Sequence, residues 1–176
     1  MDTAILIALV KYHASANDQI LTIAARLSEE ELRRPAALDH GSAFQTIRHL
    51  VDVDWSWREA CTGHDVGRTY VWDHGFVLDD LQSLHAFCRE EDARLRNYVE
   101  RLDWGALNAP PVVNKTQLAP GEEPPADRGD PPWPRWLIIA HVVNHGTQHR
   151  SELARYLTDC GHSPGNLDML DVFELP

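Results

Sequence analysis

The sequence predicts an all-α protein built as a four-helix bundle. Apolar residues recur at steps of three and four in four long segments, and clusters of proline and glycine separate these segments. Amphipathic helices of this length bury their apolar stripes by packing side by side around a shared core. With 176 residues, the chain has the length of one domain, and we expect residues 1–176 to form a single helical domain.

The first long helix is expected from about Ile5 to Leu27, because the apolar residues of this segment follow the helical period. Ser28 with Glu31 three residues later is a capping-box pattern, in which each residue satisfies a free backbone N–H of the other. This pair predicts a short helical turn. Pro35 should end that turn, since proline cannot continue a helix.

The second long helix is expected to begin after Ser42, which forms a second capping-box pattern with Gln45 three residues later. Its apolar stripe continues to about Gly63, a residue suited to end a helix. The segment that follows is mixed in polarity and contains several glycines. It predicts a loop, with a short extended piece around Thr69–Trp72.

The third long helix is expected over Asp79–Leu102 and the last over Pro134–Asp159, both from apolar periodicity. Between them, the segment Trp104–Trp133 is dense in proline and predicts a long loop before the last long helix. A short C-terminal segment follows Gly161 and is expected to pack across the bundle.

Composition and charge exclude several classes of function. The net charge of -11, without a cluster of Lys or Arg, opposes nucleic-acid binding. The apolar run Ala4–Val10 is too short to span a membrane and has no basic flank, so we expect a cytoplasmic protein that does not enter membranes. Cys61, Cys88 and Cys160 are far apart, which indicates reduced packing residues rather than disulfides.

Three histidines stand at four-residue intervals in the last helix: His141, His145 and His149. Residues four apart lie about 40° apart around a helix, so His145 and His149 can point toward one ion. His49 lies beside the apolar stripe of the second helix and is the natural third ligand in a bundle interior. Three neutral imidazoles would leave a divalent ion with an open coordination position, as reactive centres require.

Three sequence motifs make the chain resemble the DinB/YfiT-like superfamily of metal-dependent enzymes: RHLVDVDWSW around His49, HVVNHGTQHRSEL around His145 and His149, and the ending GHSPGNLDML. The resemblance covers essentially the whole chain. It implies a DinB-like four-helix bundle with a metal held by His49, His145 and His149, and frequently a homodimer. It also implies, for some relatives, transferase or isomerase activity that uses a small thiol such as bacillithiol, mycothiol or glutathione.

Other residues are candidates for the surroundings of the site. His141 lies about 80° around the helix from His149, so we expect it near the pocket or a subunit interface rather than on the ion. Asp52 and Glu152 each follow a ligand by three residues and would fix an imidazole tautomer. Arg150 would form a structural ion pair or hold an anionic substrate, and Trp57 would line the pocket. The remaining histidines are expected on the surface or in loops: His13, His40, His64, His74, His85 and His162.

The sequence therefore favours a metal-dependent enzyme with a small-molecule substrate, zinc or nickel as its ion, and manganese or iron as alternatives. A low-molecular-weight thiol is a possible cosubstrate through the family resemblance. No P-loop, GxGxxG motif or Ser-His-Asp order is present in the sequence. One alternative is a metal-binding or stress-response bundle without turnover. Another is a metal-free helical dimer whose histidines bind nothing.

Overall fold

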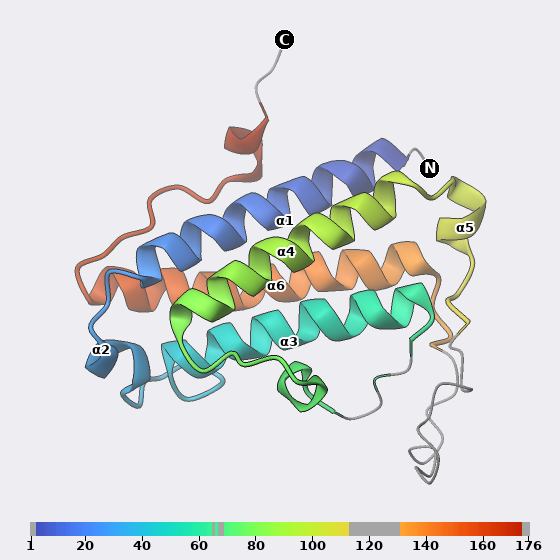
Figure 1. The fold of residues 1–176 in the computed structure, drawn as a ribbon. Helices are drawn as coiled ribbons and strands as arrows, with labels where there is room; N and C mark the ends of the chain where they lie inside the picture. The colour runs from blue at the N-terminus through green and yellow to red at the C-terminus, as the bar shows by residue number, and fades with distance from the viewer. Residues whose placement is uncertain (1–2, 65, 67–68, 113–130, 174–176) are drawn as a thin grey trace, which may run out of the picture.

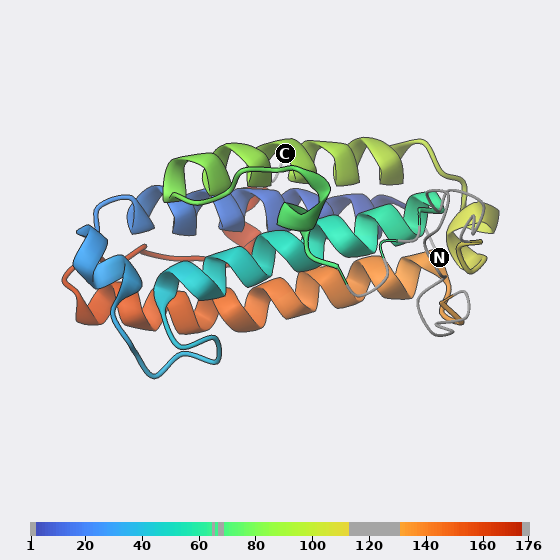
Figure 2. The same ribbon diagram turned by 60° about the horizontal axis from the view of Figure 1, so that its bottom comes forward.

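A computed structural model describes residues 3–64, 66, 69–112 and 131–173. Its four long helices lie side by side (Figure 1): α1 (Thr3–Ala24), α3 (Ala43–Thr62), α4 (Leu81–Glu100) and α6 (Arg135–Asp159). Helix α1 packs on α4 and α6, and α3 packs on the same two helices, so α1 and α3 face each other diagonally across the core (Figure 2). The predicted all-α bundle is confirmed.

The first helices form for the local reasons that the sequence indicated. Helix α2 (Glu29–Arg33) begins with the predicted capping box: Ser28 Oγ accepts a hydrogen bond from the Glu31 backbone N–H at 3.2 Å, and the Glu31 carboxylate accepts one from the Ser28 N–H at 2.9 Å. Helix α1 ends at Ala24, three residues before the expected Leu27.

Helix α3, which carries His49, has both of its predicted ends. At the start, Ser42 Oγ accepts a hydrogen bond from the Gln45 backbone N–H at 3.2 Å. At the end, Gly63 adopts φ of 93°, a left-handed conformation that side chains with a Cβ rarely adopt. Both ends are set by local chemistry, and they fix where on the helix His49 lies.

One expected extended piece, over Thr69–Trp72, is wrong. Residues Val71–His74 form instead a 3-10 turn, η1. The Asp73 carboxylate accepts a hydrogen bond from the Tyr70 backbone N–H at 2.8 Å, and Asp52 on α3 accepts one from the Val71 N–H at 2.7 Å. These two carboxylates close the turn, which a propensity for extended structure does not anticipate.

The start of the expected loop Trp104–Trp133 is also helical. Helix α5 (Trp104–Asn108) is capped by Asp103, whose carboxylate accepts a hydrogen bond from the Ala106 backbone N–H at 2.8 Å. The cap and the absence of proline before Pro110 allow one helical turn there. The proline-rich part of this segment, residues 113–130, lies outside the described residues.

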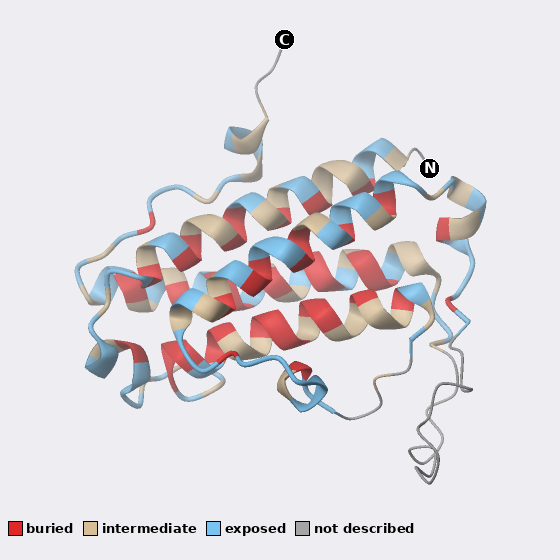
Figure 3. Ribbon diagram, in the orientation of Figure 1, coloured by how far each residue is buried: buried red, intermediate tan, exposed pale blue. Residues whose placement is uncertain are grey.

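The core follows the inward faces of the four helices (Figure 3). Two clusters of buried apolar side chains occupy the two ends of the bundle, one around Ile20, Ile47 and Leu153 and the other around Val99 and Ile139. Between them, at the middle of the helices, the core is polar and charged. This central layer consists of His13, Asn17, Asp54, Asp92, His149 and Arg150, all buried.

The C-terminal segment packs on α1. The Tyr12 hydroxyl donates a hydrogen bond to the Leu167 carbonyl at 3.1 Å, and the Gln19 side chain donates one to the Pro164 carbonyl at 2.7 Å. A short 3-10 turn, η3 (Met169–Val172), follows. No helix in the described part of the chain combines the length and apolarity that crossing a membrane requires.

Candidate metal centre

Four imidazole rings meet at the middle of the bundle, between α3 and α6. His49 comes from α3, His145 and His149 come from α6, and His40 comes from the loop before α3. The Nε2 atoms of His49 and His145 lie 3.0 Å apart. The ring centre of His149 lies 5.0 Å from that of His49 and 4.6 Å from that of His145. The three histidines that the sequence singled out as ligands are thus brought together.

The helix geometry explains this convergence. His145 and His149 are four residues apart on α6 and share one face. Helix α3 packs directly on α6, so its His49 meets them at the helix interface. His149 is 4% exposed, whereas His49 and His145 are half-buried, so one edge of the cluster faces outward.

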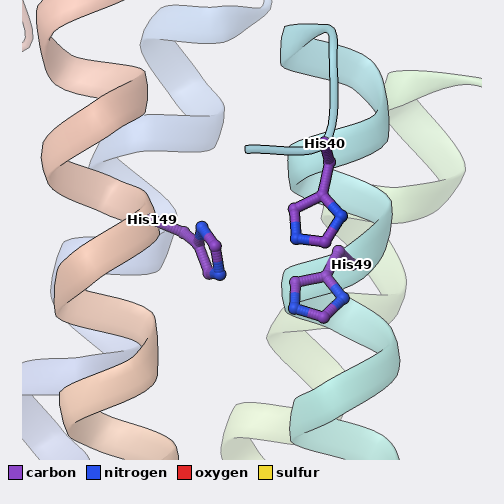
Figure 4. A group of neighbouring side chains, drawn as sticks. All are labelled: His40, His49 and His149. Carbon is purple, nitrogen blue, oxygen red and sulfur yellow. The ribbon is translucent and has the colours of Figure 1, made fainter. Parts of the chain in front are cut away.

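His40 is the member that the sequence analysis missed. It lies in a loop, as expected, yet its ring stacks on that of His49 with centres 3.8 Å apart and planes inclined by 24°. Figure 4 shows these two rings one above the other, facing His149. One ligand atom from each of these three residues lies within 4.8 Å of the other two. Periodicity could not indicate this, because a loop residue is positioned by tertiary packing.

Three imidazoles of the cluster, those of His40, His49 and His145, favour the neutral form. Burial, with a smaller contribution from the neighbouring histidines, lowers the pKa of His49 to about 4. Burial, followed by the proximity of His149, likewise lowers the pKa of His145 to about 4. The pKa of His40 is lowered for the same two reasons. Neutral imidazoles carry free lone pairs, which is the state that binds a metal ion.

These lowered pKa values predict acid sensitivity of the metal-free protein. The unfolded chain protonates His49 and His145 near their ordinary value of 6.5, whereas the folded protein resists protonation down to about 4. Stability should therefore be complete above pH 6.5 and should fall between pH 6.5 and 4. Urea denaturation of chelated protein across this range measures the loss. His49→Ala should reduce this loss of stability, whereas His141→Ala, at an exposed position, should leave it unchanged. An equal dependence of stability on pH in the two variants would contradict the role given to His49.

Of the two carboxylates expected to orient the imidazoles, Glu152 contacts the cluster and Asp52 does not. One carboxylate oxygen of Glu152 lies 3.4 Å from His149 Nδ1 and accepts a hydrogen bond from the backbone N–H of Asp39 at 3.4 Å. Glu152 thereby ties His149 to the loop that carries His40. Asp52 instead bonds to the backbone of Val71, and burial raises its pKa. Its role here is to fasten η1 to α3.

An apolar cavity of about 310 Å³ opens one helical turn away from His145. It is lined by Trp57, Trp133, Leu137, Ile138 and His141. The ring centre of His141 lies 5.9 Å from that of His145 and 5.8 Å from that of Trp57. His141 thus lies between the cavity and the cluster, and is exposed. Both the cavity and its proximity to the histidines fit a small-molecule site.

Beneath the histidines lies the central polar layer, and here one expectation is wrong. His13, expected at the surface, is fully buried on α1 because charged partners surround it. Its Nε2 lies 2.9 Å from an Asp54 carboxylate oxygen, and its Nδ1 lies 3.0 Å from Arg150 Nη1. The Arg150 guanidinium also donates to Asn17 at 2.7 Å and is 2% exposed, so it serves the core. The sequence signal for this layer was the spacing of His13 and Asn17, which are four residues apart and therefore share one face of α1.

Two further groups in the described residues have metal-ligand spacing: His13 with Asp54 and Asp92, and His149 with Asp39 and Glu152. The first is buried in the central polar layer. The second overlaps the histidine cluster and its outer carboxylate. The histidines therefore form the main candidate site.

These features define a helical bundle with a central histidine cluster that is able to bind a metal ion. The chain belongs to the DinB family, whose sequence profile matches residues 1–175. The predicted resemblance is confirmed. No curated protein sequence matches the chain.

Proposed function

We propose that His49, His145 and His149 hold one divalent metal ion and that the protein is a thiol-dependent transferase or isomerase. The observation that carries the proposal is the convergence of neutral imidazoles from α3 and α6 beside an apolar cavity. Zinc or nickel is the expected ion, with manganese or iron as alternatives. The small-molecule substrate, the homodimer and the cytoplasmic location expected from the sequence belong to the same proposal.

Two donors of the proposed set, from His49 and His145, are spaced for such an ion. Zinc–nitrogen bonds of about 2.0–2.1 Å in a tetrahedral site separate two ligand nitrogens by roughly 3.3 Å. The 3.0 Å between Nε2 of His49 and Nε2 of His145 is close to this separation. His145 Nδ1 is also buried without a hydrogen-bond partner among the described residues, so this ring satisfies its nitrogens poorly without a ligand. Neutral, converging nitrogen donors are what zinc and nickel prefer.

Other residues of the chain orient a ligand and line the substrate cavity. When bound, a divalent ion supplies Lewis acidity, which lowers the pKa of a thiol or water molecule that reaches it. Glu152 accepts from His149 Nδ1 and orients this ring. The cavity beside Trp57 and Trp133 receives the apolar part of a substrate and excludes water from it.

The thiol must come from outside the chain. Burial raises the pKa of Cys61 to about 12 and raises that of Cys88 well above its ordinary value, so neither side chain supplies a thiolate at neutral pH. Cys160 lies at the C-terminal end of α6, about three helical turns after His149. Thiol chemistry at the histidine cluster therefore needs a small thiol as cosubstrate.

The test is turnover by the metal-loaded protein. We expect consumption of an electrophile such as a chlorinated aromatic compound or a maleyl-type isomerisation substrate in the presence of bacillithiol, mycothiol or glutathione. The rate should fall to background after chelation and return when zinc or nickel is added. Trp57→Ala should raise KM for aromatic electrophiles while one ion per chain is retained.

His40 favours a second candidate function. Its ring stacks on His49 and offers a nitrogen within 4.8 Å of the ligand atoms of His49 and His149. A fourth imidazole on the ion would complete a tetrahedral site and leave no open position. The protein would then bind metal without turnover. Tight metal binding with no reaction across the thiol panel would support this second function against the first.

A further inference from the structure

Two buried polar atoms near the histidine cluster have no hydrogen-bond partner among the described residues: His145 Nδ1 and Asp54 Oδ1. A buried donor or acceptor without a partner has lost its hydrogen bonds to water without replacement, so such atoms are rare in native proteins. If His145 binds a metal ion through Nε2, its Nδ1 carries a proton and needs an acceptor. Asp54 Oδ1 is an acceptor that needs a donor.

Asp54 is held next to the turn of α6 that carries His145. Its other carboxylate oxygen, Oδ2, lies 2.9 Å from Nε2 of His13. The His13 ring packs so closely against Gly146 that a Cβ at that glycine would lie 2.6 Å from His13 Cε1. Gly146 directly follows His145. The negative charge of Asp54 also acts to raise the pKa of both His145 and His49, against the effect of burial.

The hydrogen bonds of His13 determine which oxygen of Asp54 is free. Arg150 Nη1 can only donate, so His13 Nδ1, 3.0 Å away, must be the acceptor and carry no proton. The Asn17 side-chain nitrogen also lies 3.0 Å from His13 Nε2, but its two protons are donated to Asp54 and Asp92. The His13 proton is therefore on Nε2 and is donated to Asp54 Oδ2. Asp54 Oδ1 takes no part in this bond and has no partner among the described residues.

The same tautomer argues against a second metal ion in the central layer, although His13, Asp54 and Asp92 have ligand spacing. A metal bound at His13 Nε2 would force the proton onto Nδ1. That proton would face the guanidinium of Arg150, which is also a donor. Arg150 donates to His13, Asn17 and Thr147, so the layer is organised as a hydrogen-bond network.

We propose that Asp54 is the positioning residue for His145: its Oδ1 accepts the Nδ1–H of His145 through one bridging water molecule, and thereby fixes Nε2 toward the metal ion. This inference depends on the proposed metal site. A bridging water is the link we infer, because both atoms are buried without a partner and Asp54 is bonded to His13, which packs against Gly146 beside His145. His13 and Arg150 hold Asp54 in place, so the central layer supports the metal site from below.

Asp54→Asn tests the proposal, with Asp92→Asn as the matched control. Both carboxylates are buried, both lie near His13 Nε2 at 2.9 and 3.7 Å, and both accept from Asn17. Competition titration of zinc should show an affinity about 10–100-fold lower in Asp54→Asn, as is typical for loss of a carboxylate partner of a ligand, and about unchanged in Asp92→Asn. The d–d bands of the cobalt-loaded protein should shift in the first variant only.

A measurement on the unmodified protein decides the case if Asp54→Asn fails to fold. In the zinc-loaded protein with 15N-labelled histidine, His145 should bind through Nε2 and carry a slowly exchanging Nδ1–H. Two results would overturn the role of Asp54 and leave the metal site intact. One is binding of the ion through Nδ1 of His145. The other is equal zinc affinity and equal cobalt spectra in the unmodified protein, Asp54→Asn and Asp92→Asn. Failure of the unmodified protein to take up any ion would overturn the proposed metal site itself, and with it this inference.

Discussion

His49→Ala is expected to lower the affinity of the protein for zinc by more than about 100-fold, beyond the 10–100-fold effect typical of residues that only orient a ligand. The substitution leaves His145 and His149 on α6, but removes the nitrogen that faces His145 at 3.0 Å. Two imidazoles from one helix make an incomplete site. Elemental analysis of untagged protein, with a competition titration, measures the loss.

Two comparisons make this result specific. His141→Ala lies one turn before His145 on the same helix and is exposed, so it should keep one ion per chain. His40→Ala should also keep one ion, because His49, His145 and His149 remain. Since the substitution removes the ring that stacks on His49, exogenous thiols and anions should bind to the ion more readily. Loss of the ion in His40→Ala as complete as in His49→Ala would place His40 among the ligands and would favour the non-catalytic function.

Arg150→Ala is expected to destabilise the metal-free protein by about 3–5 kcal/mol, the range for removal of one partner from a buried ionic network. The guanidinium is 2% exposed and donates to His13, Asn17 and Thr147. Without it, the carboxylates of Asp54 and Asp92 would share the core with no full positive charge among the six residues of the central layer. Chemical denaturation of chelated protein measures the change.

Arg155→Ala is the control for this effect. It lies on the same helix and forms an ion pair with Asp159 at 2.9 Å, but its side chain is 80% exposed. Solvent screens such pairs, so the expected change is below about 1 kcal/mol. Similar losses in both variants would show that the charge of Arg150 is not compensating the buried carboxylates.

The sequence predicted the fold well because the decisive signals are local. Ser28 with Glu31, Ser42 and Gly63 set helix ends through contacts within a few residues, and each does so in the structure. The extended piece at Thr69–Trp72 was wrong because a distant residue, Asp52, fastens that turn. Tertiary contacts of this kind leave no periodic trace in the sequence.

The candidate site could be predicted from the sequence only in part. His145 and His149 are four residues apart on one helix, so their shared face follows from spacing alone. The convergence of His49 with them depends on how α3 packs on α6, for which the family resemblance supplied the expectation. His40 and His13 were missed, because a loop and a diagonal contact across the core place them.

The proposed metal site is tested most directly by anomalous scattering from crystals of the native protein, measured at the absorption edges of zinc and nickel. We expect one peak per chain, bonded to Nε2 of His49 and His145 and to a ring nitrogen of His149. No peak after incubation with these ions, or a peak among His13, Asp54 and Asp92 instead, would contradict it.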